Sequence, residues 1–165
     1  MSDSSMPPQR VCAPSMRQSV KRGLCPALTI NQHGYRLRFY PSNHSGQLWV
    51  DDSLREPELR LVKYYLRRGD DVIVAGANVG DTVLTASIKV GSSGRVWAIE
   101  PHPRTFEFLV GNIMLNGVSN IEAPNVVGAP DGGNLAFCGG RRDVINRVGE
   151  TGVFVRAQRL DELVG

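Results

Sequence analysis

Apolar and polar side chains alternate along residues 28–40. The apolar residues of this pattern, which we expect to face the interior, are Tyr35, Leu37 and Phe39. Strict alternation predicts a β-strand with one buried face, and the turn residues at 31–34 predict a hairpin. Arg36 and Arg38 fall on the opposite face. We expect them on the solvated side of an edge strand, and a role in holding an anionic substrate is the alternative.

A helix is predicted after a polar loop, so that residues 28–55 form an N-terminal hairpin and loop. Ser53 and Glu56 have the spacing of a capping box, and Pro57 suits the first turn of a helix. Apolar residues then recur at helical spacing, at Leu59, Val62 and Leu66. We expect this helix to end at Gly69 and to lead into a strand.

Strands and helices alternate from residue 70 onward. Residues 71–75, DVIVA, predict a buried strand, which the turn GANVG joins to a helix over residues 82–89 that stops at Gly91. Residues 95–99, RVWAI, predict the second strand. This order is typical of an α/β fold with a parallel sheet.

The second half of the alternation is less regular. A helix follows the turn after RVWAI, and its packing face is predicted at Phe106, Leu109, Val110, Ile113 and Met114. Residues 116–117, Asn-Gly, end this helix. Residues 121–127 predict a third strand that Pro124 interrupts, and weaker strands are expected at 135–137 and 153–158.

Composition narrows the class of protein. The 165 residues are 41% apolar and 21% charged, as in a single globular domain, and no apolar run approaches the roughly 20 residues that span a bilayer. The net charge of +3 comes from the first 27 residues, where four basic side chains face one acid. We therefore interpret residues 1–27 as a disordered basic tail and expect neither a nucleic-acid nor a membrane partner.

Cysteine usage indicates a reducing compartment. Cys12, Cys25 and Cys138 are widely spaced and form no CxxC pair, so free thiols are expected rather than a metal site. The N-terminus has no apolar stretch of signal-peptide length. We expect a cytoplasmic protein, and the acid-poor tail leaves an organelle transit peptide as an alternative.

The turn GANVG is the first candidate for ligand binding. Gly76 and Gly80 would let a ligand approach backbone N–H groups at the carboxyl edge of the sheet, where α/β folds bind ligands. Glu100 ends the second strand 20 residues after Gly80, at the distance typical of a carboxylate that holds ribose hydroxyls. Two glycines instead of three favour a nucleoside over a pyrophosphate. A ligand-free turn and a solvated Glu100 are the alternatives.

Three segments together resemble a known family. VIVAGANVGDT, GRVWAIEPHPRTFEFLVGNIMLNG and VRAQRLDELV, in this order, resemble the FkbM family of S-adenosylmethionine-dependent methyltransferases. The resemblance covers residues 56–165. It implies a Rossmann-like class I methyltransferase sheet with helices on both faces. It also implies methyl transfer from S-adenosylmethionine to a hydroxyl of a small molecule or sugar, without a metal.

The resemblance also implies which residues bind the cofactor. They are Gly76, Ala77, Asn78, Gly80, Asp81, Thr82, Glu100 and Pro101. The glycine turn would wrap the methionine end, Glu100 would hold the ribose and Pro101 would shape the adenine side. Asp81 and Thr82 would present helix N–H groups to the cofactor carboxylate, with a helix cap as the alternative. Asn116 matches a family position, but a helix stop also explains it.

Two departures from the family pattern bear on activity. Val74 stands where the family usually has an acid, and the chain ends before the family's next strand. We expect an incomplete sheet with an open edge that self-association or a partner chain would cover. The alternative function is a non-catalytic, degenerate methyltransferase domain that binds the cofactor or a partner.

No catalytic residue can be assigned from the sequence. His102 lies at the carboxyl edge of the predicted sheet and is a candidate base, with a solvent-facing imidazole as the alternative. His33 and His44 are expected in loops without a partner residue.

Overall fold

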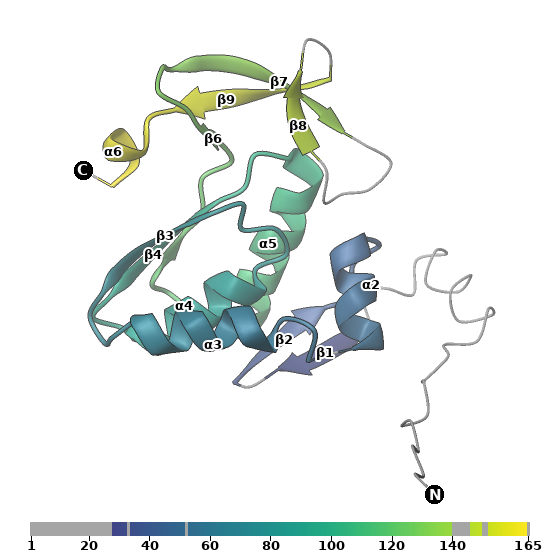
Figure 1. The fold of residues 1–165 in the computed structure, drawn as a ribbon, viewed down its shortest axis with the longest axis vertical. Coiled ribbons are helices and arrows are strands. Elements are labelled where there is room, and N and C mark those ends of the chain that lie inside the picture. The colour runs from purple at the N-terminus through teal and green to yellow at the C-terminus, as the bar shows by residue number, and fades with distance from the viewer. Residues whose placement is uncertain (1–27, 33, 52, 140–145, 150–151, 165) are drawn as a thin grey trace, which may run out of the picture.

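The computed structural model describes residues 28–164 apart from 33, 52, 140–145 and 150–151 (Figure 1). Predictions for the tail 1–27 and for His33 therefore lie outside the described residues. The helices are α2 (Asn43–Val50), α3 (Glu56–Tyr65), α4 (Asp81–Val90), α5 (Pro103–Asn116) and α6 (Leu160–Leu163). The strands form a two-stranded, a three-stranded and a four-stranded sheet.

The two-stranded sheet is the predicted hairpin. Strands β1 (Thr29–Gln32) and β2 (Tyr35–Arg38) pair antiparallel, with Ile30 opposite Leu37. The predicted inward residues are buried, and Leu37 packs in one cluster with Leu48 of α2 and Leu84 of α4. The hairpin therefore packs on the α/β part of the chain.

Side chains of α5 close the outer edge of β2. The Asn116 amide accepts from Arg36 N–H (2.8 Å) and donates to Arg36 C=O (2.7 Å). The Asn112 oxygen accepts from Arg38 N–H (2.7 Å). These amides take the place of a third strand, since they satisfy the backbone groups that a strand would pair.

The three-stranded sheet confirms the predicted α/β fold. Strands β3 (Asp71–Ala75), β4 (Arg95–Ile99) and β5 (Ile121–Glu122) run parallel in the order β3-β4-β5. Strand β3 leads through α4 into β4, and β4 leads through α5 into β5, as in Rossmann-like folds. One buried cluster joins both helices to β4, with members Val83, Ala86, Val90, Val96, Ala98 and Leu109. In the described residues α4 and α5 thus share one face, where the resemblance implied helices on both faces.

Strand β3 lies at the edge of this sheet. Among the described residues it pairs with β4 alone, from Asp71 opposite Arg95 to Ala75 opposite Ile99. Val74 is half-buried against the cluster shared with α4 and α5, whereas Ile73 is 41% exposed. The strand that the sequence predicts to be buried is therefore exposed on one face.

The first two helices of the described chain, α2 and α3, differ from the prediction. Helix α2 was expected to be loop, and its N-cap Ser42 accepts from Ser45 N–H (3.1 Å). The capping box at Ser53 and Glu56 is wrong: the N-cap of α3 is Arg55, and the Ser53 hydroxyl donates instead to the Asp51 carboxylate (2.7 Å). Helix α3 also ends at Tyr65, before the predicted Gly69.

The predicted packing face of α5 needs one correction. Leu109 is fully buried, as expected, but Met114 is 77% exposed, and Asn112 is buried in its place. The helix ends at Asn116, because Gly117 adopts a left-handed conformation with φ +61°.

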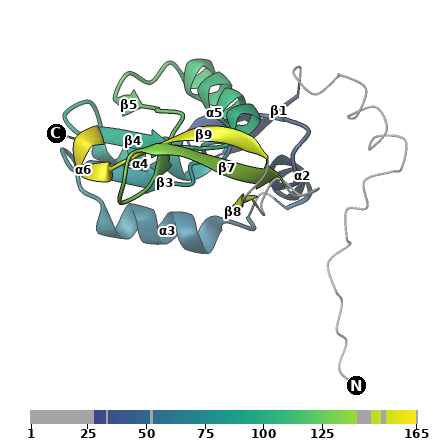
Figure 2. The same ribbon diagram turned by 90° about the horizontal axis from the view of Figure 1, so that it is seen from above.

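The predicted third strand is split between two sheets. Residues 121–122 form β5, but β6 (Val127–Gly128) pairs with β9 (Val153–Gln158), since Pro124 breaks the segment. Strands β7 (Gly133–Gly139) and β8 (Asn146–Gly149) complete a sheet of order β6-β9-β7-β8. This sheet lies beyond the carboxyl edge of β3 and β4 (Figures 1 and 2). In the described part of the chain, no helix is long and apolar enough to cross a membrane.

Candidate functional site

The glycine turn between β3 and α4 is held by the last carbonyl of β4. Gly76 N–H and Ala77 N–H both donate to Ile99 C=O (2.9 Å each), and Gly80 N–H donates to Ala77 C=O (3.0 Å). The φ angles of Gly76 (+76°), Asn78 (+50°) and Gly80 (+100°) are positive. The backbone of this turn therefore needs the conformational freedom that the sequence supplies.

The Glu100 carboxylate joins this turn to the turn after β4. It is 6% exposed and accepts from Asn78 N–H (2.9 Å) and from His102 N–H (3.0 Å). Burial raises the pKa of Glu100, and the two N–H groups only partly oppose that rise. The structure thus brings together Gly76, Asn78 and Glu100, three of the candidate site residues. Each carboxylate oxygen keeps a lone pair for a further donor.

Asn125 secures the second turn and was not predicted. Its amide donates to Glu100 C=O (2.7 Å) and to Pro101 C=O (3.1 Å). Only its place directly after the strand-breaking Pro124 could have drawn attention to it. Asn125 fixes the backbone of Pro101, the residue expected on the adenine side.

The turn contains unfilled space and an unpaired acceptor. A Cβ built on Gly76 would meet no atom within 4 Å, so the backbone there is open to a ligand. The Asn78 side-chain oxygen is buried and has no hydrogen-bond partner among the described residues. Buried acceptors are normally satisfied, so this oxygen fits a donor on a bound molecule such as an ammonium group. These features fit the methionine end of S-adenosylmethionine.

Asp81, the first residue of α4, has two ion-pair partners, an imidazole and a guanidinium. His44 Nε2 lies 3.2 Å and Arg55 Nε 3.4 Å from its Oδ2. The expectation that His44 lies in a loop without a partner is wrong, because it lies in α2 and faces Asp81. Burial would raise the pKa of Asp81, but the hydrogen bond and charge of His44 and the charge of Arg55 hold that pKa below its usual value. The Asp81 carboxylate also accepts from Thr82 N–H.

The candidate base His102 caps helix α5. Its Nδ1 accepts from Thr105 N–H (3.5 Å) and lies 3.4 Å from the Thr105 hydroxyl. Asn116 does not join the glycine turn, since its amide pairs with the Arg36 backbone. Among the described residues, no cluster of three or more His, Cys, Asp or Glu could hold a metal ion.

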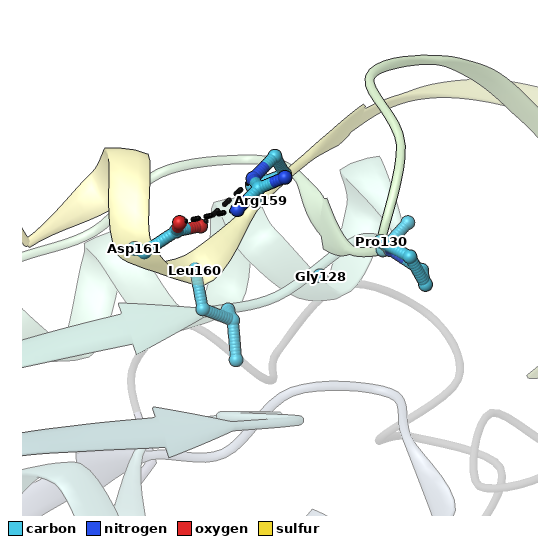
Figure 3. Close-up of a pocket in the computed structure, with 6 residues that line it drawn as sticks. Gly128, Pro130, Arg159, Leu160 and Asp161 are labelled. Carbon is cyan, nitrogen blue, oxygen red and sulfur yellow. Dashed lines mark hydrogen bonds and ion pairs between the residues drawn. The ribbon is translucent and has the colours of Figure 1, made fainter.

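A pocket of about 450 Å³ lies elsewhere, at the carboxyl ends of β6 and β9 (Figure 3). Its lining residues are Gly128, Ala129, Pro130, Arg159, Leu160 and Asp161. The Arg159 guanidinium is paired with the Asp161 carboxylate, which lowers the pKa of Asp161. None of the predicted cofactor residues lines this pocket, so it is not the predicted site.

Comparisons with known proteins give partial structural matches. No protein-family model and no curated protein matches the chain. A SAM-dependent methyltransferase from Agrobacterium tumefaciens matches 61% of this chain and 32% of its own, at 16% identity and a TM-score of 0.48. A SAM-dependent methyltransferase from Aquifex aeolicus matches 51% and 47%, at 25% identity and 0.44. TYW2 of M. jannaschii, in complex with AdoMet, matches 58% and 41%, at 19% identity and 0.46.

The matched segments span less than half the length of each of these three proteins. The fold assignment therefore stands on the strand order, register and crossover helices described above.

Proposed function

We propose that this chain binds S-adenosylmethionine and transfers its methyl group to a hydroxyl of a small molecule or sugar, as an FkbM-type methyltransferase. The observation that carries the proposal is the buried Glu100 carboxylate, which bonds to the backbone of both turns at the carboxyl edge. A nucleoside binds at this place in Rossmann-like folds, with its ribose on such a carboxylate.

Each part of the cofactor has a proposed partner. Glu100 accepts from the ribose hydroxyls, and Pro101 borders the adenine. The turn from Gly76 to Gly80 surrounds the methionine part, where the unpaired Asn78 oxygen accepts from the amino group. N–H groups at the start of α4 favour the carboxylate. Bound S-adenosylmethionine supplies an activated methyl group, and the task of the chain is to orient the acceptor against it.

The second candidate function is a non-catalytic cofactor-binding or interaction module. Val74 favours it, because a half-buried valine cannot replace the acid usual in the family. The two described histidines favour it as well, since His44 faces Asp81 and His102 caps α5. In this second function the open edge of β3 is covered by a second copy or a partner chain. Methyl transfer to a panel of hydroxyl acceptors would contradict it.

Cofactor binding is tested without knowledge of the acceptor. We expect S-adenosylhomocysteine to bind the purified chain in calorimetry, and Glu100→Ala to weaken binding about 10- to 100-fold. This range follows from losing hydrogen bonds to a charged group, worth about 1.5–3 kcal/mol. The matched control is Glu107→Ala, an exposed glutamate of α5, which should bind as the parent does. A folded parent chain that does not bind would overturn the proposal.

The affinity should also depend on pH through Glu100. The pKa of this carboxyl is raised above 4.5 in the free protein, so the group gains a proton as the pH falls through that raised value. The protonated form is a poorer acceptor for ribose hydroxyls, and binding should weaken below the raised pKa. Titrations with S-adenosylhomocysteine from neutral pH downward, as far as the chain stays folded, measure this, and Glu100→Gln should flatten the profile. An identical profile in Glu100→Gln would assign the pH dependence to another group.

A further inference from the structure

The residues around Asp81 link the glycine turn to the N-terminal unit, defined here as residues 28–55. Asp81 follows Gly80 directly and begins α4, and its side chain is 4% exposed. His44 lies in α2, and Arg55 is the residue directly before α3. Both ion-pair partners of Asp81 therefore belong to the N-terminal unit. The Asp81 carboxylate therefore adjoins the glycine turn, and the two side chains that pair with it belong to the N-terminal unit.

These contacts are needed because Asp81 is buried. A buried carboxylate without a partner is strongly destabilising. His44 Nε2, Arg55 Nε and Asp81 Oδ2 meet full hydrogen-bond geometry with no described residue, so the ion-pair contacts of 3.2 and 3.4 Å between them are what compensates their burial. If His44 and Arg55 moved away, Asp81 would turn toward solvent and the start of α4 would shift with it.

Asn112 makes a second link between the unit and the turn. Its amide oxygen accepts from Arg38 N–H of β2 (2.7 Å), and its amide nitrogen donates to Val79 C=O in the turn (2.8 Å). The side chain is fully buried. One amide thus fixes the distance between β2 and the middle of the glycine turn.

Tyr35 makes a third link, to the first turns of α4. The Thr85 hydroxyl donates to the Tyr35 hydroxyl oxygen (3.2 Å) in the interior. Burial raises the pKa of Tyr35 to about 12, so the phenol stays neutral. The N-terminal unit therefore contacts the turn and its helix through three separate polar links.

We propose that the N-terminal unit is part of the cofactor site, with His44 and Arg55 as positioning residues that hold the glycine turn through Asp81. Ligand binding to the turn then stabilises the N-terminal unit, and loss of the unit weakens binding by the same factor, because coupling between two sites is reciprocal. The ligand part of this inference rests on the proposed function. The positioning part does not.

The positioning part is tested on the full chain without ligand, by amide hydrogen exchange. In His44→Ala the amides of Gly80 and Leu84, which bond within the turn and the first turn of α4, should exchange about tenfold faster. The Gly94 amide, beyond the far end of α4, should not change. Gln47→Ala, at an exposed position of the same helix α2, is the control. Unchanged exchange at Gly80 and Leu84 in a folded variant would overturn the proposal.

Arg55→Ala provides a milder variant should His44→Ala fail to fold, since the Arg55 side chain is 33% exposed. It should accelerate the same two amides by a smaller factor. His44→Gln, whose amide can still donate to Asp81, should restore part of the protection, as expected if His44 acts through that carboxylate.

The ligand part is tested with S-adenosylhomocysteine. His44→Ala and Asp81→Asn should each weaken binding about tenfold, and the double variant should bind no more weakly than the single ones, because both act through one contact. Independent, multiplying effects would contradict the proposal. If the parent chain does not bind at all, the proposed function fails, and the exchange experiment still decides the positioning role.

Discussion

Replacing Asn112 by alanine is expected to lower the free energy of unfolding by about 4 kcal/mol. The substitution leaves Val79 C=O and Arg38 N–H without their partner in the interior, and each buried unsatisfied group costs about 1–3 kcal/mol. A small cavity adds to the loss. Urea unfolding followed by circular dichroism measures the change. The same variant should weaken S-adenosylhomocysteine binding, because Val79 lies in the glycine turn.

Asn116→Ala is the matched control, one turn later on the same helix. Its amide also bonds to the β2 backbone, but Asn116 is half-buried and these hydrogen bonds are exposed, so water can replace them. We expect a loss of about 1 kcal/mol. Equal losses in the two variants would mean that the bond to Val79 contributes nothing beyond the closure of β2.

Gly80→Ala should also be strongly destabilising, by about 2–4 kcal/mol. A Cβ at this position would lie 2.9 Å from Leu109 Cδ1, and Leu109 is fully buried and cannot move aside freely. The φ of +100° adds backbone strain for any residue other than glycine. Thermal unfolding measures the loss as a lower melting temperature.

Gly76→Ala separates the cost of backbone strain from the cost of a steric clash. Gly76 also has a positive φ, +76°, but a Cβ there meets no atom within 4 Å. We expect a loss of about 1 kcal/mol and a folded protein. Because the new methyl group would occupy the space left for the ligand, this variant should bind S-adenosylhomocysteine much more weakly than the parent. Unimpaired binding would place the ligand elsewhere.

The hairpin, strands β3 and β4, the glycine turn and the position of Glu100 could be predicted because their signals are local. DVIVA and RVWAI are apolar runs bounded by turn residues, and the hairpin shows strict alternation. Glycines fall where the backbone needs a positive φ, at Gly76, Gly80 and Gly91. The position of a carboxylate at the end of the second strand then follows from topology alone.

Helix α2 and its role could not be predicted from local signals. Its buried face consists of His44, Ser45 and Leu48, so it lacks the apolar periodicity of an amphipathic helix, and Gly46 lies in its interior. The partner of His44 is 37 positions away in the chain, at Asp81. Only the packing of the hairpin against α4 brings the two together.

The packing face of α5 shows the same limit. Apolar spacing predicts that Met114 faces the interior, yet the side-chain amide of Asn112 is buried there instead. The reason is that α5 serves two surfaces: Leu109 packs against the sheet, and Asn112 satisfies backbone groups of β2 and of the glycine turn. A hydrophobicity pattern predicts the packing of Leu109 but not the hydrogen bonds of Asn112.

Two of the described edge strands, β2 and β3, differ in their tendency to aggregate. The outer edge of β2 cannot template another chain, because its N–H groups are already bonded to Asn112 and Asn116. The outer edge of β3 has no such cover among the described residues, and its DVIVA sequence is short, apolar and free of proline. Self-assembly at high concentration should therefore begin at the edge of β3 rather than at the outer edge of β2. Binding experiments on this chain are best made dilute, where that edge meets only water.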